Sequence, residues 1–193
     1  MYSFISGKIV EKNPAYVVLE NQGIGYFINI TLNTFEAIGD AADVKLYIHF
    51  AVREDAHTLY GFYEEREREL FLLLQTVPGV GYSTARLILS SLTVRETINA
   101  IADNNLKVIQ GVKGIGAKTA QRIVVDLRDK VGKISGTEDN SSQQHNNLKD
   151  EALYALTVLG FGKTAVEKVI DKLVQQSPDS TVEQLVKNAL RML

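Results

Sequence analysis

The sequence predicts an α+β multidomain protein: an N-terminal five-stranded β barrel of the OB type, a helical tandem helix-hairpin-helix domain, a flexible linker and a C-terminal three-helix bundle. Three observations predict this order. The hydrophobic period changes from that of strands to that of helices near residue 64, a helical motif occurs twice, and a polar stretch precedes the last amphipathic helices. The domain boundaries fall at 1–63, 64–134, 135–147 and 148–193.

The first domain is predicted from short segments rich in Ile, Val, Tyr and Phe, separated by turn residues. A helical turn is expected near Asn33–Ile38. Because an open sheet built from so few residues would leave unprotected edges, we expect the strands to close into a barrel. The expected strands are Tyr2–Val10, Tyr16–Glu20, Gly25–Ile30, Val44–Val52 and Thr58–Tyr63.

Helical spacing of apolar residues begins at Glu64 and predicts five helices in the second domain. Residues 132–147 lose this periodicity, and the part from 135 onward has no large apolar side chain, which predicts a flexible tether. Three amphipathic helices follow, and Ser180 with Glu183 is the expected capping box of the last one. The helices of the second domain are expected at 64–75, 82–90, 94–103, 105–110 and 117–131.

Composition limits the function classes. The chain has no Cys, which excludes disulfides, thiolate metal clusters and a cysteine nucleophile. No apolar run approaches the ~18 residues of a membrane span, and no secretory signal is visible, so we expect a cytoplasmic protein without a membrane partner. Although the net charge is −2, residues 76–133 hold nine basic and four acidic residues (9 − 4 = +5), which indicates a local polyanion site.

The doubled motif is the strongest indication of function. TVPGVGYSTARLIL at 76–89 aligns without gaps to GVKGIGAKTAQRIV at 111–124. Each copy places two glycines in a tight turn between helices, and the next helix begins with unpaired N–H groups and a positive dipole end. Two such turns can grip the phosphates that flank a minor groove without reading bases. The pattern therefore predicts sequence-independent duplex binding.

An acidic hairpin is expected within HFAVREDAHTLYGF at 49–62, with Glu54 and Asp55 at its tip. One interpretation is a solvated acidic turn. The other is electrostatic exclusion, in which the carboxylates repel phosphates and fix where a duplex cannot lie.

Two other function classes stay open. A helix-hairpin-helix repair enzyme, either a glycosylase or a nuclease, would need a catalytic Asp such as Asp103. A protein-interaction scaffold would use the hairpins as plain helix turns. No nucleotide or metal motif is complete: Gly162-Lys163-Thr164 lacks the first glycine of a phosphate loop, and His49, His57 and His145 lack ligand spacing. We therefore expect no catalytic residues, no metal and no cofactor.

Taken together, the barrel with its Arg-Glu-Asp hairpin, the paired hairpins, the polar tether and ALTVLGFGKTA at 155–165 resemble the RuvA family over the whole chain. Members of this family are the Holliday-junction-binding subunits of bacterial RuvAB branch-migration complexes. The resemblance implies a non-catalytic DNA-binding subunit that forms a homotetramer, or an octamer on DNA, and holds four-way junction DNA open in recombination and repair. It also implies the RuvB ATPase hexamer as the partner that uses ATP, and a RuvC-type resolvase as a further partner.

The resemblance also implies site residues. Glu54 and Asp55 match an acidic pin at the crossover, and Leu156, Leu159 and Phe161 match the motor contact. Some relatives have Lys where this chain has Ser83, so the first hairpin is expected to grip phosphate more weakly than the second. The implied DNA-binding residues are Gly79, Val80, Gly81, Tyr82, Ser83, Thr84, Arg86, Gly114, Ile115, Gly116, Ala117, Lys118, Thr119 and Arg122.

Overall fold

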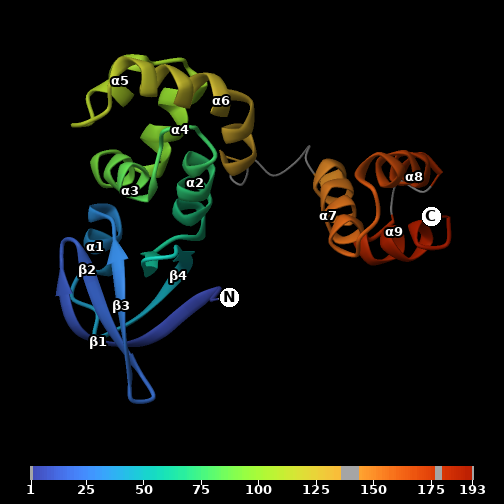
Figure 1. Cartoon of the computed structure of the whole chain (residues 1–193). Helices are drawn as coiled ribbons and strands as arrows, with labels where there is room; N and C mark the ends of the chain where they lie inside the picture. The colour runs from blue at the N-terminus through green and yellow to red at the C-terminus, as the bar shows by residue number, and fades with distance from the viewer. Residues whose placement is uncertain (1, 136–143, 177–179, 193) are drawn as a thin grey trace. The chain divides into compact units, whose positions relative to one another are not determined.

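The computed structural model describes residues 2–135, 144–176 and 180–192 of the chain (Figure 1). The chain divides into two compact units, Met1–Gly136 and Thr137–Leu193. The first unit contains both the barrel and the tandem helices, and the second contains the C-terminal helices.

The predicted five-stranded closed barrel is confirmed. Its strands follow the order β1-β2-β3-β5-β4, and only the β3–β5 pair is parallel. Alternate side chains point inward and form a core that includes Val17, Leu19, Ile28 and Leu46. The helix α1 (Leu32–Ile38) lies at the end of the barrel that faces the helices (Figure 1). The strands are β1 (Phe4–Asn13), β2 (Tyr16–Asn21), β3 (Ile24–Ile30), β4 (Asp43–Val52) and β5 (His57–Phe62).

The predicted helices of the first unit are also present, and they enclose one apolar core that includes Phe71, Leu74, Ile88 and Ile123. The last of them extends four residues beyond the expected end at 131. These helices are α2 (Glu65–Gln75), α3 (Tyr82–Ser91), α4 (Val94–Ala102), α5 (Leu106–Gln110) and α6 (Ala117–Ser135).

The segment 135–147, predicted to be a linker, is described only at its two ends. Ser135 ends α6, and α7 begins at Gln144, so both ends are helical where the sequence lacks helical periodicity. Helices extend into such polar stretches because each added residue of a helix closes a further backbone hydrogen bond. Residues 136–143 lie outside the described part of the chain.

A polar seam joins the barrel to the helices. The Asn33 side-chain amide donates to the carbonyl oxygens of Leu89 at 2.6 Å and Leu92 at 2.9 Å. Glu67 of α2 is buried beneath α1, where its carboxylate accepts hydrogen bonds from the hydroxyls of Thr31 and Thr34. These contacts fix the orientation of the barrel against the helices.

The second unit is a three-helix bundle of α7 (Gln144–Val158), α8 (Lys163–Gln176) and α9 (Val182–Ala189) around a small apolar core. The capping box predicted at Ser180 and Glu183 is wrong by one residue. Thr181 has an extended backbone and is the N-cap. Its hydroxyl accepts a hydrogen bond from the backbone N–H of Gln184, and the side-chain oxygen of Gln184 accepts one from the backbone N–H of Thr181. Both pairs satisfy the motif, so the pattern alone cannot choose between them. Within the described residues, no helix is long and apolar enough to cross a membrane.

We expect the seam at Glu67 to make stability depend on pH. Burial raises the pKa of this carboxyl, while the Thr31 and Thr34 hydroxyls partly oppose the shift. The folded state therefore holds the proton more tightly, and this contribution to the free energy of unfolding falls as pH rises above the ordinary value of 4.5. Urea unfolding of the parent and of Glu67→Gln between pH 4 and 8 measures this, and the parent should lose stability relative to the variant as pH rises.

Glu67→Ala serves as the comparison, since both hydroxyls then lose their acceptor. It should lower the free energy of unfolding by about 1–3 kcal/mol. A constant difference between the parent and Glu67→Gln across the pH range would contradict a titrating buried carboxyl.

Candidate nucleic-acid interface

The first hairpin is the turn between α2 and α3. Val77 and Val80 are buried in the helical core on either side of Gly79, which has a φ of +91°. This left-handed conformation is readily available only to glycine, which explains its place in the motif. The backbone N–H of Val80 donates to the carbonyl of Val77 at 3.0 Å and closes the turn.

The second hairpin, between α5 and α6, repeats this geometry bond for bond. Gly114 has a φ of +88°, and the N–H of Ile115 donates to the carbonyl of Val112 at 3.0 Å. The backbone N–H of Ala120 donates to the carbonyl of Gly116 at 3.0 Å. In the first hairpin the N–H of Ala85 donates to the carbonyl of Gly81 at 2.9 Å. The predicted pair of equivalent helix-hairpin-helix turns is thus confirmed.

Each hairpin exposes the N-terminus of a helix to solvent. A Cβ at Gly81 or Gly116 would meet no atom within 4 Å, so the surface beside each turn is open. Gly81 is the N-cap of α3 and carries no capping side chain, which leaves the first N–H groups of the helix available. Backbone N–H groups at a helix N-terminus bind phosphate oxygens, and the open surface lets a DNA backbone approach.

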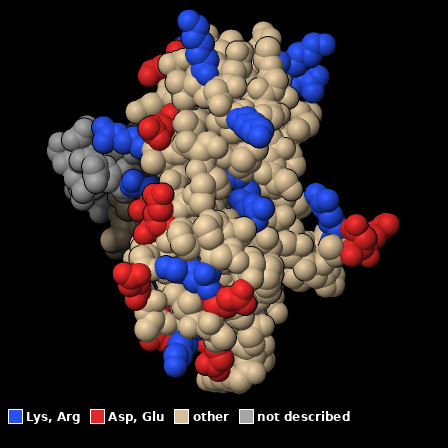
Figure 2. Space-filling model, turned by 90° about the vertical axis from the view of Figure 1, so that its left-hand side faces the viewer, with Lys and Arg blue, Asp and Glu red and all other residues tan. Residues whose placement is uncertain are grey.

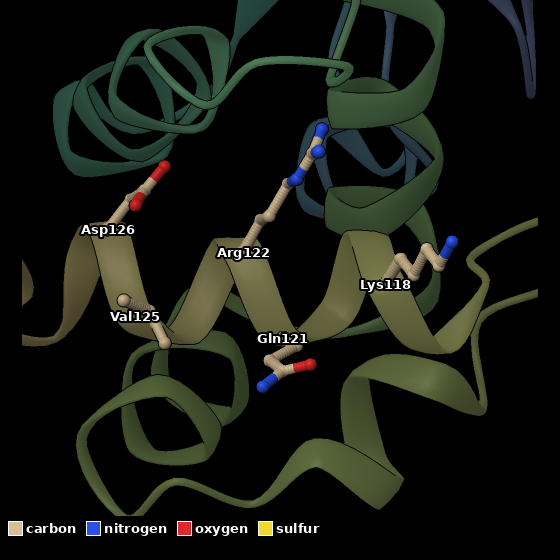
Figure 3. A pocket seen from close by; sticks show the side chains of 5 residues that line it. All are labelled: Lys118, Gln121, Arg122, Val125 and Asp126. Atoms are coloured by element: carbon tan, nitrogen blue, oxygen red, sulfur yellow. The ribbon is translucent and has the colours of Figure 1, made fainter.

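The second hairpin adds cations to this arrangement. Lys118 and Arg122, one turn apart on α6, are both exposed, and neither has an ion-pair partner among the described residues. Figure 3 shows Arg122 and Asp126 on the same side of α6, with Lys118 nearer the start of the helix. These three residues, with Gln121 and Val125, line a hollow of about 270 Å³. Lys118 thus lies in the first turn of its own helix, directly after the hairpin.

The first hairpin has no such cation in the first turn of its own helix, α3. Ser83 is exposed at the position that corresponds to Lys118. Arg86 of α3, predicted to lie near the DNA, donates from Nη1 to Asn29 Oδ1 at 2.9 Å and to the carbonyl of Ala15 at 3.3 Å. These two hydrogen bonds join Arg86 of α3 to β3 and to the turn between β1 and β2.

The acidic hairpin between β4 and β5 has the predicted geometry. The N–H of Arg53 donates to the carbonyl of Ala56 at 2.9 Å, which closes the turn and places Glu54 and Asp55 at its tip. Both carboxylates are exposed, and neither forms a salt bridge within the described residues. In Figure 2, basic side chains are spread over the upper part of the visible face, and a projection at its right carries a cluster of acidic side chains with a basic one beside it.

Comparisons with known proteins agree with this geometry. The chain matches three family models: the RuvA N terminal domain over residues 1–61, the SAM-like helix-hairpin-helix tandem over 71–129 and the RuvA C-terminal domain over 147–193. Full-length relatives named Holliday junction branch migration complex subunit RuvA are 52% identical in Christiangramia forsetii, 48% in Parabacteroides distasonis and 47% in Flavobacterium psychrophilum. Each alignment covers all of both chains. The chain belongs to the RuvA family.

The three residues of the C-terminal domain that are predicted to contact a motor differ in their exposure to solvent. Leu156 is fully buried in the core of the bundle, so it cannot contribute to a contact surface, and Phe161 is partly buried against the same core. Leu159 is 61% exposed, next to Val158 at 68%. Residues three apart share a face of a continuous helix, but α7 ends at Val158, so Leu159 leaves the buried face that Leu156 occupies. Tyr154, one turn before Val158, is 74% exposed and was not singled out in the sequence.

One candidate residue lies apart from the hairpins, and one contact of the RuvA fold was missed by sequence patterns. Asp103, considered as a catalytic residue, is the exposed C-cap of α4 and lies in neither hairpin turn. Arg53, at the base of the acidic hairpin, lies over the ring of Tyr82 in the first hairpin. Its position directly before two acidic residues is the only signal of it in the sequence.

We expect Lys118→Ala to weaken DNA binding and to make it less sensitive to salt. Loss of one phosphate contact lowers the slope of log affinity against log salt by about 0.9 for duplex DNA. Fluorescence-anisotropy titrations at several salt concentrations measure this slope. Lys172→Ala, which removes an equal charge from an exposed position on α8, is the matched control and should match the parent. An unchanged slope in Lys118→Ala would contradict the assignment.

Proposed function

We propose that this chain is the DNA-binding subunit of a Holliday junction branch-migration complex. In this role it binds four-way junctions independently of sequence, holds them open and recruits the motor that moves the crossover. The observation that carries the proposal is the combination, within one compact unit, of two equivalent phosphate-binding turns and an unneutralised acidic tip. The names of the full-length relatives support the same function.

The hairpins account for binding without sequence preference. Their available groups are backbone N–H donors, Ser and Thr hydroxyls, Lys118 and Arg122, all of which suit phosphate oxygens. Two equivalent turns with the same backbone geometry fit two phosphate backbones on either side of a minor groove. Recognition of this kind follows the shape of DNA and not its bases.

The acidic tip accounts for selectivity toward junctions. Carboxylates at Glu54 and Asp55 repel the phosphates of a continuous duplex that runs across the hairpin. In the proposed homotetramer, four tips meet near one axis and four pairs of hairpins surround them. Four arms that diverge from an acidic centre fit this arrangement, whereas one linear duplex does not. Two such tetramers on one junction give the proposed octamer.

The C-terminal unit is the proposed docking site for the RuvB ATPase hexamer. Tyr154, Val158 and Leu159 form an exposed apolar surface, here called the α7 end surface. Exposed apolar groups at one site of a small bundle suit a protein partner. In this division of labour ATP hydrolysis belongs to the motor, and a RuvC-type resolvase acts on the junction that this chain holds open.

The direct test is a gel-shift titration of the purified chain. It compares an immobile four-way junction with a duplex of equal length at ~0.1–0.2 M salt, where non-specific phosphate binding is weak. We expect strong preference for the junction and no cleavage of either DNA. Equal, weak binding to both would overturn the proposed function, and cleavage by the chain alone would favour a repair enzyme.

Neutralising the acidic tip should reduce selectivity. We expect Glu54→Gln with Asp55→Asn to raise affinity for duplex several-fold, since one repulsive pair of unit charges at ~4 Å costs about 1 kcal/mol in water. The ratio of junction to duplex affinity should fall. Asp40→Asn with Asp43→Asn changes the charge equally at exposed positions of the same barrel and should leave the ratio unchanged. Equal ratios in the tip variant and the parent would remove any role for the tip.

The α7 end surface should be needed for motor stimulation alone. We expect Leu159→Asp to retain junction binding but to lose most stimulation of RuvB-driven branch migration, measured as release of labelled strands from a mobile junction. Thr164→Asp, at an exposed position of the same bundle, is the matched control and should stimulate normally. Full stimulation by Leu159→Asp would show that the motor docks elsewhere.

A further inference from the structure

The base of the acidic hairpin contacts the first DNA-binding turn through one pair of side chains. The guanidinium carbon of Arg53 lies 5.1 Å from the centroid of the Tyr82 ring. Arg53 follows the last residue of β4, and Tyr82 is the first residue of α3. The cation–π contact therefore links the barrel hairpin to the very start of the helix whose N–H groups face solvent.

The Tyr82 ring is held in place by packing against other aromatic rings. It stacks on those of Tyr60 and Phe71. The ring centroids are 5.4 Å apart for Tyr60 and 6.1 Å for Phe71, and the angles between the ring planes are 24° and 22°. It also packs against His49 at 5.4 Å. Because Phe71 is fully buried in the helical core, this aromatic cluster anchors Tyr82 from beneath. The guanidinium of Arg53 thus rests on a surface that is fixed to both the barrel and the helices.

The contact determines where the charge of Arg53 lies. Arg53 immediately precedes two carboxylates, yet it forms no salt bridge with Glu54 or Asp55. Held over Tyr82, it leaves the tip with both negative charges and places a positive charge beside Ser83. Arg53, Asp55, Tyr60, Tyr82 and Ser83 contribute to the lining of a hollow of about 100 Å³ at this point.

We propose that Arg53 is a DNA-phosphate ligand of the first hairpin and that the Tyr82 ring positions it there. The cation that the second hairpin carries as Lys118 on its own helix is supplied to the first hairpin by the barrel. Tyr82 also prevents Arg53 from pairing with the acidic tip, which would neutralise part of its charge. This inference rests on the proposed function, since it adds a phosphate ligand to the same DNA-binding face.

The experiment compares the salt dependence of binding to a four-way junction and to an equal duplex. Arg53→Gln should lower the salt slope by about 0.9 for each Arg53 that contacts a phosphate, and Arg53→Lys should restore most of it because the charge is retained. Arg191→Gln removes an equal charge from an exposed position in the second unit and should match the parent. An unchanged slope in Arg53→Gln would overturn the phosphate contact.

Substitutions of Tyr82 test the positioning. Tyr82→Phe keeps the ring and is the reference with which Tyr82→Leu is compared. Tyr82→Leu frees Arg53 to pair with the tip, so both the salt slope and the ratio of junction to duplex affinity should fall. Thermal unfolding of each variant checks that the unit remains folded. Identical behaviour of Tyr82→Leu and Tyr82→Phe would overturn the role of the ring.

Failure of this inference is distinguishable from failure of the proposed function. If the parent chain binds junction and duplex equally, the proposed function itself fails. If the parent is selective for junctions but the Arg53 and Tyr82 variants match it in salt slope and selectivity, only the inference fails.

Discussion

The barrel and the helices of the first unit are joined through a buried carboxylate that forms no ion pair with any described residue. Glu67 lies under α1, where hydrogen bonds from Thr31 and Thr34 satisfy its two oxygens. Thr31 also caps α1, and Thr34 accepts from the N–H of Tyr63 where the barrel ends. A buried charge is tolerated only with such complete hydrogen bonding. Because the acidic tip belongs to the barrel and the hairpins belong to the helices, their spacing depends on this seam.

The two hairpins share a backbone and differ in chemistry. Both use a left-handed glycine and a buried aliphatic residue to expose the N-terminus of a helix. Only the second adds a cation, Lys118, within that first turn. In the first, Arg86 donates to Asn29 of the barrel, so its guanidinium is held at the seam. A repeat that looks symmetrical in sequence is therefore unequal in its electrostatics.

The second unit has a core of its own, so its functional surface can be assigned separately. Seven buried residues of the described part, including Leu156 and Ile170, hold three short helices together. A bundle of this size has little apolar surface to spare, and exposed apolar residues such as Tyr154 and Leu159 are costly unless a partner covers them. Under the proposed function, a separately folded docking unit lets the motor pull without disturbing the contacts that bind DNA.

The sequence by itself determined the closed barrel, the helices and the paired turns, because hydrophobic periods and left-handed glycines such as Gly79 and Gly114 act over a few residues. It also placed Glu54 and Asp55 at an exposed tip. Only the tertiary structure decided that Arg86 faces the barrel, that Glu67 is buried and that Arg53 rests on Tyr82. Each of these depends on partners from elements that lie far apart in the chain and meet only when the barrel packs on the helices. Local patterns specify which elements form, whereas the direction of a charged side chain follows from what packs beside it.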